Sequence, residues 1–175
     1  MDAETTAYLK KEVNHEFARF EECSKPENFD ALPDIPTGRY ISDDFFALEQ
    51  ERIWSKTWLL AGHADEVTDI GSYQLWESSG TPILIVRGRD NQIRAFYNTC
   101  THRGGPLVRQ ESGQEKVFVC KYHCWAFSLD GALNHVPDEH EFIAIDKSKR
   151  GRKPIRCEMF GNWIYVNRDP NAMPL

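Results

Sequence analysis

Two short stretches decide what kind of protein this is: Cys100-Thr101-His102-Arg103-Gly104 and Cys120-Lys121-Tyr122-His123-Cys124-Trp125. Each stretch pairs a soft thiolate donor with an imidazole, a combination that suits a transition metal. Only one or two residues separate the cysteine from the histidine, so both side chains of a stretch can face one point. The intervening residues are enough to bring the two stretches together. The pattern predicts a metal site of two cysteines and two histidines.

Two kinds of metal site use this ligand set. In a [2Fe–2S] cluster, replacing two of the four thiolates by neutral histidines on one iron removes negative charge and makes the reduced form easier to reach. Cys100 and Cys120 then bind one iron, and His102 and His123 bind the other. A structural zinc ion usually takes Cys-x-x-Cys and His-x-x-x-His pairs, which are not the pairs found here. We favour the cluster and keep a zinc-stabilised interaction module as an alternative.

The composition is that of a folded globular protein. Of the 175 residues, 41% are hydrophobic and 27% are charged. The net charge of −6 argues against nucleic acid as a partner. No run approaches the roughly 18 apolar residues of a membrane-spanning helix, and Met1-Asp2-Ala3-Glu4 lacks the layout of a signal peptide. Five cysteines, an odd number, do not predict a disulfide framework. We expect a cytoplasmic protein that does not bind a membrane.

Helices are predicted only near the N-terminus. Leu9, Val13, Phe17 and Phe20 form one stripe at helical spacing. Ser42 is a suitable N-cap for a second helix. From residue 58 onward the chain has short runs of β-branched and aromatic residues, and these predict strands: Trp58–Ala61, Tyr73–Trp76, Ile83–Arg87, Ile93–Tyr97, Val117–Val119, Ala126–Ser128, Ile155–Met159 and Trp163–Asn167.

These elements predict a mainly β fold, an antiparallel β-sandwich or barrel with two metal-binding loops, preceded by N-terminal helices. We expect residues 1–55 to form a helical extension and residues 56–170 to form the β domain.

The chain resembles the N-terminal Rieske domain of Rieske non-haem iron (aromatic-ring-hydroxylating) oxygenase α subunits. The two loops carry most of the resemblance, and it extends over almost everything from about residue 36 to the end. Outside the loops it rests on several further stretches: Trp54–Gly62, Gly71-Ser72-Tyr73, Ala95-Phe96-Tyr97-Asn98, Asp130-Gly131 and Val166-Asn167-Arg168-Asp169-Pro170.

The resemblance implies a Rieske [2Fe–2S] cluster and a role in relaying single electrons. Arg103, Gly104, Tyr122 and Trp125 are then the neighbours of the ligands. High-potential respiratory relatives have hydroxyls two and four residues after the second histidine, where this chain has Trp125 and Phe127. Without those hydroxyls the potential is expected near the low end of the Rieske range of roughly −150 to +300 mV.

The resemblance also implies what lies around this domain. A reductase or ferredoxin would donate the electrons, and a mononuclear non-haem iron would activate O₂ and hydroxylate the substrate. The whole enzyme would be a homotrimer in which one subunit's cluster serves its neighbour's iron. The substrate pocket and that iron would lie in a second domain. We expect this chain to lack that domain and to be inactive as an oxygenase by itself.

His135 and His140, with Asp138 between them, superficially match the iron-binding motif of such a second domain. We reject that interpretation because Pro137 interrupts a stretch that the family places on a helix. A standalone Rieske ferredoxin is the remaining alternative function. It would resemble only the cluster region and would leave residues 1–55 unexplained.

Overall fold

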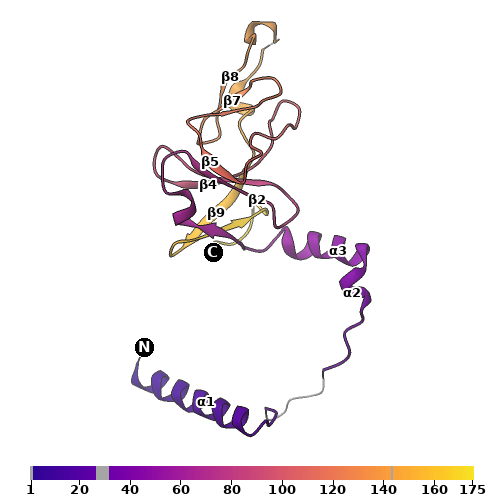
Figure 1. Cartoon of the computed structure of the whole chain (residues 1–175), viewed down its shortest axis with the longest axis vertical. Coiled ribbons are helices and arrows are strands. Elements are labelled where there is room, and N and C mark those ends of the chain that lie inside the picture. The colour runs from indigo at the N-terminus through magenta and orange to yellow at the C-terminus, as the bar shows by residue number, and fades with distance from the viewer. Residues whose placement is uncertain (1, 27–31, 143) are drawn as a thin grey trace. The chain divides into compact units, whose positions relative to one another are not determined.

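A computed structural model describes residues 2–26, 32–142 and 144–175 (Figure 1). The chain divides into two compact units, one ending at Tyr40 and the other spanning Ile41–Leu175. The helices are α1 (Ala3–Glu21), α2 (Gly38–Ile41) and α3 (Asp43–Glu49), the last followed by a π-helical turn at Gln50–Trp54. No helix in this described part is long and apolar enough to cross a membrane.

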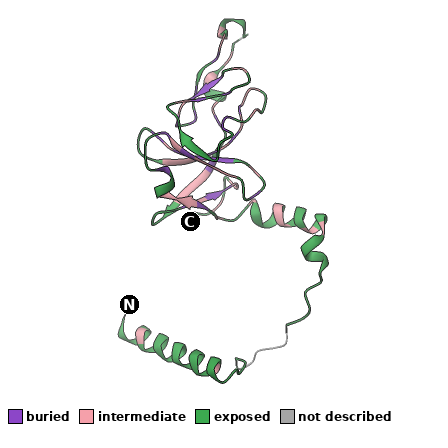
Figure 2. Cartoon of the chain, in the orientation of Figure 1, coloured by how far each residue is buried: buried purple, intermediate pink, exposed green. Residues whose placement is uncertain are grey.

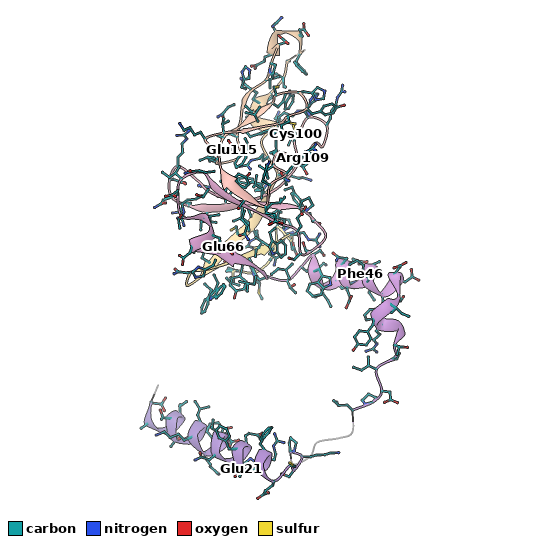
Figure 3. The ribbon with its side chains drawn as sticks, in the orientation of Figure 1. Glu21, Phe46, Glu66, Cys100, Arg109 and Glu115 are labelled. Carbon is teal, nitrogen blue, oxygen red and sulfur yellow. The ribbon has the colours of Figure 1, made fainter. Side chains whose placement is uncertain are left out.

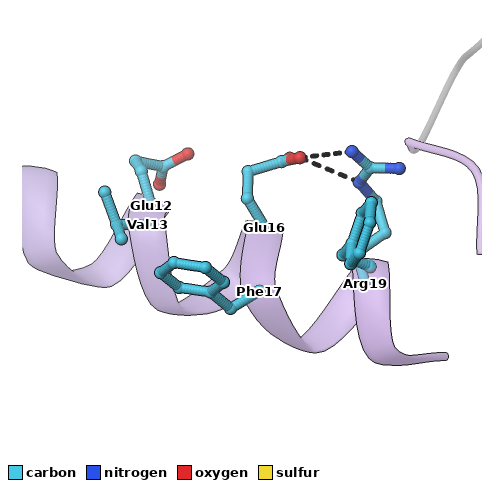
Figure 4. A pocket seen from close by; sticks show the side chains of 6 residues that line it. Glu12, Val13, Glu16, Phe17 and Arg19 are labelled. Carbon is cyan, nitrogen blue, oxygen red and sulfur yellow. Dashed lines mark hydrogen bonds and ion pairs between the residues drawn. The ribbon is translucent and has the colours of Figure 1, made fainter.

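α1 contains the helical stripe that the sequence predicts. Its N-cap is Asp2, whose carboxylate accepts a hydrogen bond from the backbone N–H of Thr5 at 2.7 Å. The side chains of the apolar stripe are exposed. Figure 4 shows Val13 and Phe17 of this stripe near the Glu16–Arg19 ion pair. They line a shallow groove along the helix together with Glu12, Glu16, Arg19 and Phe20.

α3 begins where the sequence predicts. The hydroxyl of Ser42 accepts a hydrogen bond from the backbone N–H of Phe45 at 3.2 Å. Asp43 and Asp44 follow in the first turn, where their negative charge is favourable next to the positive end of the helix dipole.

The rest of the larger unit is built from antiparallel strands. Seven of them form one sheet in the order β1-β10-β9-β4-β3-β2-β5, and three form a second sheet in the order β6-β7-β8. The bounds are β1 (Leu59–His63), β2 (Ser72–Trp76), β3 (Ile83–Arg87), β4 (Ile93–Tyr97), β5 (Ser112–Gln114), β6 (Phe118–Val119), β7 (Ala126–Phe127), β8 (Leu133–His135), β9 (Pro154–Phe160) and β10 (Trp163–Asn167). Three 3₁₀ turns join them, at Ala64–Val67, Glu139–Glu141 and Lys147–Lys149.

β3 is an interior strand of the larger sheet, between β4 and β2, and is buried on both faces. Ile83 and Ile85 point into a core formed with β1, β9 and β10, while Leu84 and Val86 point into a second core that continues to the smaller sheet. A strand with both faces covered reads as an uninterrupted apolar run, which explains the sequence Ile83-Leu84-Ile85-Val86. Figure 2 shows the buried residues concentrated in the strands and absent from α1.

The predicted mainly β, antiparallel fold with preceding helices is confirmed, and all eight predicted strands are present with small shifts at their ends. β5 and β8 were not predicted, because they are three residues long and largely polar. The expected division at residue 55 stays a prediction.

Candidate metal centre

The two cysteine–histidine stretches form loops with the same backbone path. In loop 1 (100–105), the carbonyl of Cys100 accepts from the N–H of Gly104 at 2.9 Å, and the N–H of Cys100 donates to the carbonyl of Gly105 at 2.8 Å. In loop 2 (120–125), the carbonyl of Cys120 accepts from Cys124 and its N–H donates to Trp125, both at 2.9 Å. Each loop therefore closes back onto its own cysteine.

The fourth residue after each cysteine has a left-handed backbone. Gly104 has φ 76° and Cys124 has φ 57°. Glycine adopts this conformation freely, whereas a residue with a Cβ is strained in it. Cys124 therefore occupies a position of loop 2 at which a glycine would be free of this strain.

Asn98 fixes the base of loop 1. Its side chain is buried, and its carbonyl oxygen accepts from the N–H groups of Leu107 and Val108, both at 3.1 Å. Its amide nitrogen donates to the carbonyl of Val108 at 2.8 Å. Three hydrogen bonds from one buried amide hold the chain entering the loop against the chain leaving it.

The two thiols lie together in the core. Cys100 and Cys120 are each 2% exposed and pack among the apolar residues between the sheets. Figure 3 labels Cys100. A Cβ added to Gly105 would lie 3.7 Å from Cys120 Sγ, so loop 1 passes directly over the second thiol. Burial raises the pKa of Cys100, as does its side-chain hydrogen bond with Cys120, while the N–H groups of His102 and Arg103 act in the opposite direction.

The two imidazoles form a second pair. The rings of His102 and His123 have centroids 4.5 Å apart, and both residues are half-buried. His102 Nδ1 is buried and has no hydrogen-bond partner in the described part of the chain. Burial lowers the pKa of His102, and the charges of His123, Arg103 and Arg150 act in the same direction. Buried polar atoms normally have a partner, so a buried imidazole nitrogen without one is suited to bind a metal.

Aromatic side chains hold the two imidazoles in place. Trp125 is 3% exposed and stacks on His102, with the rings 9° from parallel and their centroids 4.7 Å apart. Tyr122 is 67% exposed, and its ring lies 3.9 Å from that of His123. Phe142 meets the rings of both His102 and Trp125 edge-on, at 6.5 and 6.2 Å. Nothing in the sequence assigned Phe142 to the site, because only the fold brings it there.

The four ligand candidates form two pairs and do not surround one point. Across residues 2–26, 32–142 and 144–175, no three His, Cys, Asp or Glu side chains are arranged to hold a single ion. A zinc site needs its four ligands around one metal. A Rieske cluster has two irons, one with two cysteines and one with two histidines. The donor set and its pairing fit the cluster.

The remaining histidines of interest lie outside this pairing. His135 is the last residue of β8, His140 lies in the 3₁₀ turn Glu139–Glu141, and Asp138 is the left-handed residue before that turn. That they do not bind iron stays a prediction.

Residues 57–148 match the family model of the Rieske [2Fe–2S] domain. The chain belongs to the Rieske family. This match covers both loops and the segment that contains Phe142.

The relatives of this Rieske domain are oxygenase subunits. It is 38% identical over 151 residues to the carnitine monooxygenase oxygenase subunit of Escherichia coli (strain K12), a match covering 84% of this chain and 40% of that subunit. It is 35% identical to the benzene 1,2-dioxygenase subunit alpha of Pseudomonas putida, over 86% of this chain and 35% of that one.

A crystal structure of a quaternary ammonium Rieske monooxygenase in complex with an inhibitor superposes with a TM-score of 0.78 at 34% identity, covering 86% of this chain and 43% of that one. The chain thus spans about 40% of the length of the relatives it matches.

These likenesses confirm the predicted resemblance to the Rieske domain of oxygenase α subunits and the [2Fe–2S] cofactor. The likeness to oxygenase subunits extends well outside the cluster loops, which a standalone Rieske ferredoxin would not explain.

Proposed function

We propose that Cys100 and Cys120 bind one iron of a Rieske [2Fe–2S] cluster and that His102 and His123 bind the other. The observation that carries this assignment is the pairing: two buried thiols in contact, two imidazoles 4.5 Å apart, and His102 Nδ1 buried without a partner. When bound, such a cluster accepts and releases one electron at a time.

The protein's own residues define how the site works. The cysteine pair is buried in the core, while the histidine pair is half-exposed, so electrons pass most directly through the imidazole side. Trp125 fixes the plane of His102, and Tyr122 covers His123. Trp125 and Phe127 carry no hydroxyl to donate to the cluster sulfurs, which supports a potential near the low end of the Rieske range, about −150 mV.

In the whole protein, the domain would relay electrons from a reductase or ferredoxin to a mononuclear non-haem iron that activates O₂ for hydroxylation of the substrate. Support comes from the relatives, which are oxygenase subunits, and from a solved quaternary ammonium Rieske monooxygenase described with inter-subunit electron transfer. The same relation between subunits supports an oligomer, which we propose is a homotrimer. A cytoplasmic location completes the proposal, and it is supported by the five cysteines, none of which forms a disulfide in the described structure.

Electron paramagnetic resonance of the reduced protein tests the ligand assignment. Mixed thiolate and imidazole ligation should give the low average g value of a Rieske centre, with two irons per chain by elemental analysis. His102→Cys or His123→Cys should lower the potential wherever the cluster survives, because each replacement adds a negative charge. A spectrum of the four-thiolate type, or one zinc ion per chain, would overturn the assignment.

The absence of a catalytic iron is tested in the same sample. Iron close to three atoms per chain, falling by one in His135→Ala or His140→Ala, would show that these two histidines bind metal after all.

A further inference from the structure

Arg152 carries a charge inside the core. It is 4% exposed, and it is the one charged side chain in the described part of the chain that is buried. Its guanidinium lies over two aromatic rings, with Cζ 3.9 Å from the ring centroid of Phe96 and 4.7 Å from that of Phe118. Because charged side chains are almost never fully buried unless they are paired, we looked for the partner of this one.

The guanidinium has only neutral partners. Nη2 donates to the carbonyls of Ser128 and Leu129, both at 3.2 Å. Within residues 2–26, 32–142 and 144–175, Nε and Nη1 have no hydrogen-bond partner and no carboxylate pairs with Arg152. The carboxylate of Asp130 acts on Arg152 only from a distance, since it accepts from Ser128 Oγ and from the N–H of Ala132.

Arg152 is charged at neutral pH. Burial lowers its pKa to about 9, while the negative charge of Asp130 acts in the opposite direction. The faces of Phe96 and Phe118 stabilise a cation, but rings and carbonyls carry no net charge. The field of the guanidinium therefore extends beyond its contacts, and water screens it little inside the core.

The same core contains the two thiols of the centre. Phe118, Cys100 and Cys120 belong to one cluster of buried residues. Phe118 and Cys120 are buried on either side of the exposed Val119, so their side chains point the same way at the end of β6. Their Cα atoms are then about 7 Å apart. The charge of Arg152 thus lies against a ring that is two residues from a proposed iron ligand.

Reduction changes the charge near Arg152. With two thiolates and two neutral imidazoles, a Rieske cluster has no net charge when oxidised and one negative charge when reduced. A buried cation attracts the reduced form and has little effect on the oxidised one. A positive charge in this core therefore favours reduction.

We propose that Arg152 tunes the potential of the centre, because its buried charge stabilises the reduced cluster. This inference rests on the proposed function, since it assumes that the two loops bind the cluster. It adds a residue outside both loops that raises the potential. Arg152 thus offsets part of the effect of Trp125 and Phe127, which offer the cluster sulfurs no hydroxyl.

A purely structural role for Arg152 predicts a different result. Arg152 also holds the turn between β7 and β8, through the two carbonyls that Nη2 meets and through its backbone N–H, which donates to the carbonyl of Gly131 at 2.7 Å. If this is its whole role, replacing Arg152 lowers the free energy of unfolding and leaves the potential unchanged.

The test is a redox titration of the cluster-loaded protein, followed by visible absorbance. Arg152→Met keeps a long side chain without the charge, and Arg152→Gln also removes the charge but keeps a donor for the two carbonyls. In both variants the ratio of reduced to oxidised cluster at a fixed applied potential should fall about tenfold, which is a shift of about 59 mV for one electron. Should Arg152→Met fail to fold, Arg152→Gln still gives the measurement.

Two controls separate the charge from its surroundings. Leu129→Val disturbs the same core without changing any charge. Arg89→Met removes a positive charge from an exposed position on a small pocket that Leu129 also lines. Both controls should keep the ratio of reduced to oxidised cluster within about twofold of the parent, because water screens an exposed charge.

Unchanged potentials in both Arg152 variants, with a lower free energy of unfolding, would overturn the proposal. So would a shift in Arg152→Met that is absent from Arg152→Gln, or an equal shift in Leu129→Val, because the charge would then not be the cause. Failure of the proposed function looks different: the parent protein would lack the visible spectrum of a Rieske centre before any titration.

Discussion

Loop 1 and loop 2 share a backbone path but fill it differently. In both, the cysteine N–H and carbonyl are bonded to residues five and four positions later. Loop 1 has its histidine two residues after the cysteine and a glycine at the left-handed position; loop 2 has its histidine three residues after and a cysteine there. Backbone geometry places the two thiols, and the offset of the histidine then decides where each imidazole points.

The loops also differ in what supports them. Loop 1 is held from outside, by the side chain of Asn98 at its base and by the bond from Thr101 to Arg150. Loop 2 supplies its own aromatic residues, the buried Trp125 and the exposed Tyr122. Trp125 stacks on the histidine of loop 1, so the second loop supports the first. The comparison teaches that the two loops form one unit, with the buried Trp125 as a contact between them.

The largest effect should be a difference in cluster content between variants of the two cysteines of loop 2. Cys120→Ala should abolish the cluster, because it removes a buried ligand, whereas Cys124→Ala should keep it, because that thiol is exposed. Visible absorbance and iron content after purification measure both. Retention of the cluster in Cys120→Ala together with its loss in Cys124→Ala would reverse our assignment of ligands in loop 2.

The next effect compares the two aromatic residues of loop 2. Trp125→Ala should lower the free energy of unfolding by about 3–5 kcal/mol, as is usual for a fully buried tryptophan. Tyr122→Ala should change it by less than about 0.5 kcal/mol, because its side chain is mostly exposed. Urea unfolding of the loaded proteins gives both values.

Should Trp125→Ala fail to fold, Trp125→Phe keeps a ring against His102 and remains measurable. Equal costs for the Trp125 and Tyr122 variants would contradict the unequal support that we assign to them.

A smaller effect tests the left-handed position of loop 1. A Cβ at Gly104 would meet no atom within 4 Å, so Gly104→Ala reports the backbone conformation alone. We expect a loss of about 1–2 kcal/mol in the free energy of unfolding. Gly38→Ala is the control, since its Cβ is equally free of contacts and its φ is not positive. A loss of the same size in the control would remove the backbone as the cause.

The bond from Thr101 to Arg150 should stabilise the protein by about as much as one ordinary hydrogen bond. Thr101→Val keeps the shape of the side chain but removes the donor to Arg150, and we expect a cost of about 1 kcal/mol in the free energy of unfolding. Lys121, at the equivalent place in loop 2, makes no such bond in the described structure, so Lys121→Ala should cost less than about 0.5 kcal/mol. Urea unfolding of the Thr101→Val and Lys121→Ala variants, measured in parallel, gives both costs, and equal costs would contradict the role of the bond to Arg150.

The smallest effect has the opposite sign. Cys124→Gly removes the strain of a left-handed residue, worth about 1–2 kcal/mol, but gives the unfolded chain more freedom. The net gain in the free energy of unfolding should be about 0.5–1 kcal/mol. A destabilised Cys124→Gly protein with an intact cluster would show that the thiol of Cys124 makes a contact that outweighs the strain.

Much of the fold could be predicted because its signals are local. The bounds of β3 and β4 follow from two runs of β-branched and aromatic residues on either side of a polar turn. The start of α3 follows from Ser42 as a cap. β5 and β8 could not be predicted, since neither has the alternation of a half-buried strand, and both exist because a neighbouring strand offers free hydrogen-bonding groups.

The sequence by itself determined the chemistry of the centre. Two cysteines and two histidines at spacings of one and two residues can be read without a fold, because the backbone of a short loop keeps neighbouring side chains together.

The tertiary structure decided everything that depends on residues far apart in the chain. It buried the thiols and left the imidazoles half-exposed, stacked Trp125 on the other loop's histidine, and brought Phe142 and Arg150 to the same edge. Contacts such as the bond between Thr101 and Arg150, 49 residues apart, form only when the sheets have brought distant segments together, so no local pattern in the sequence records them.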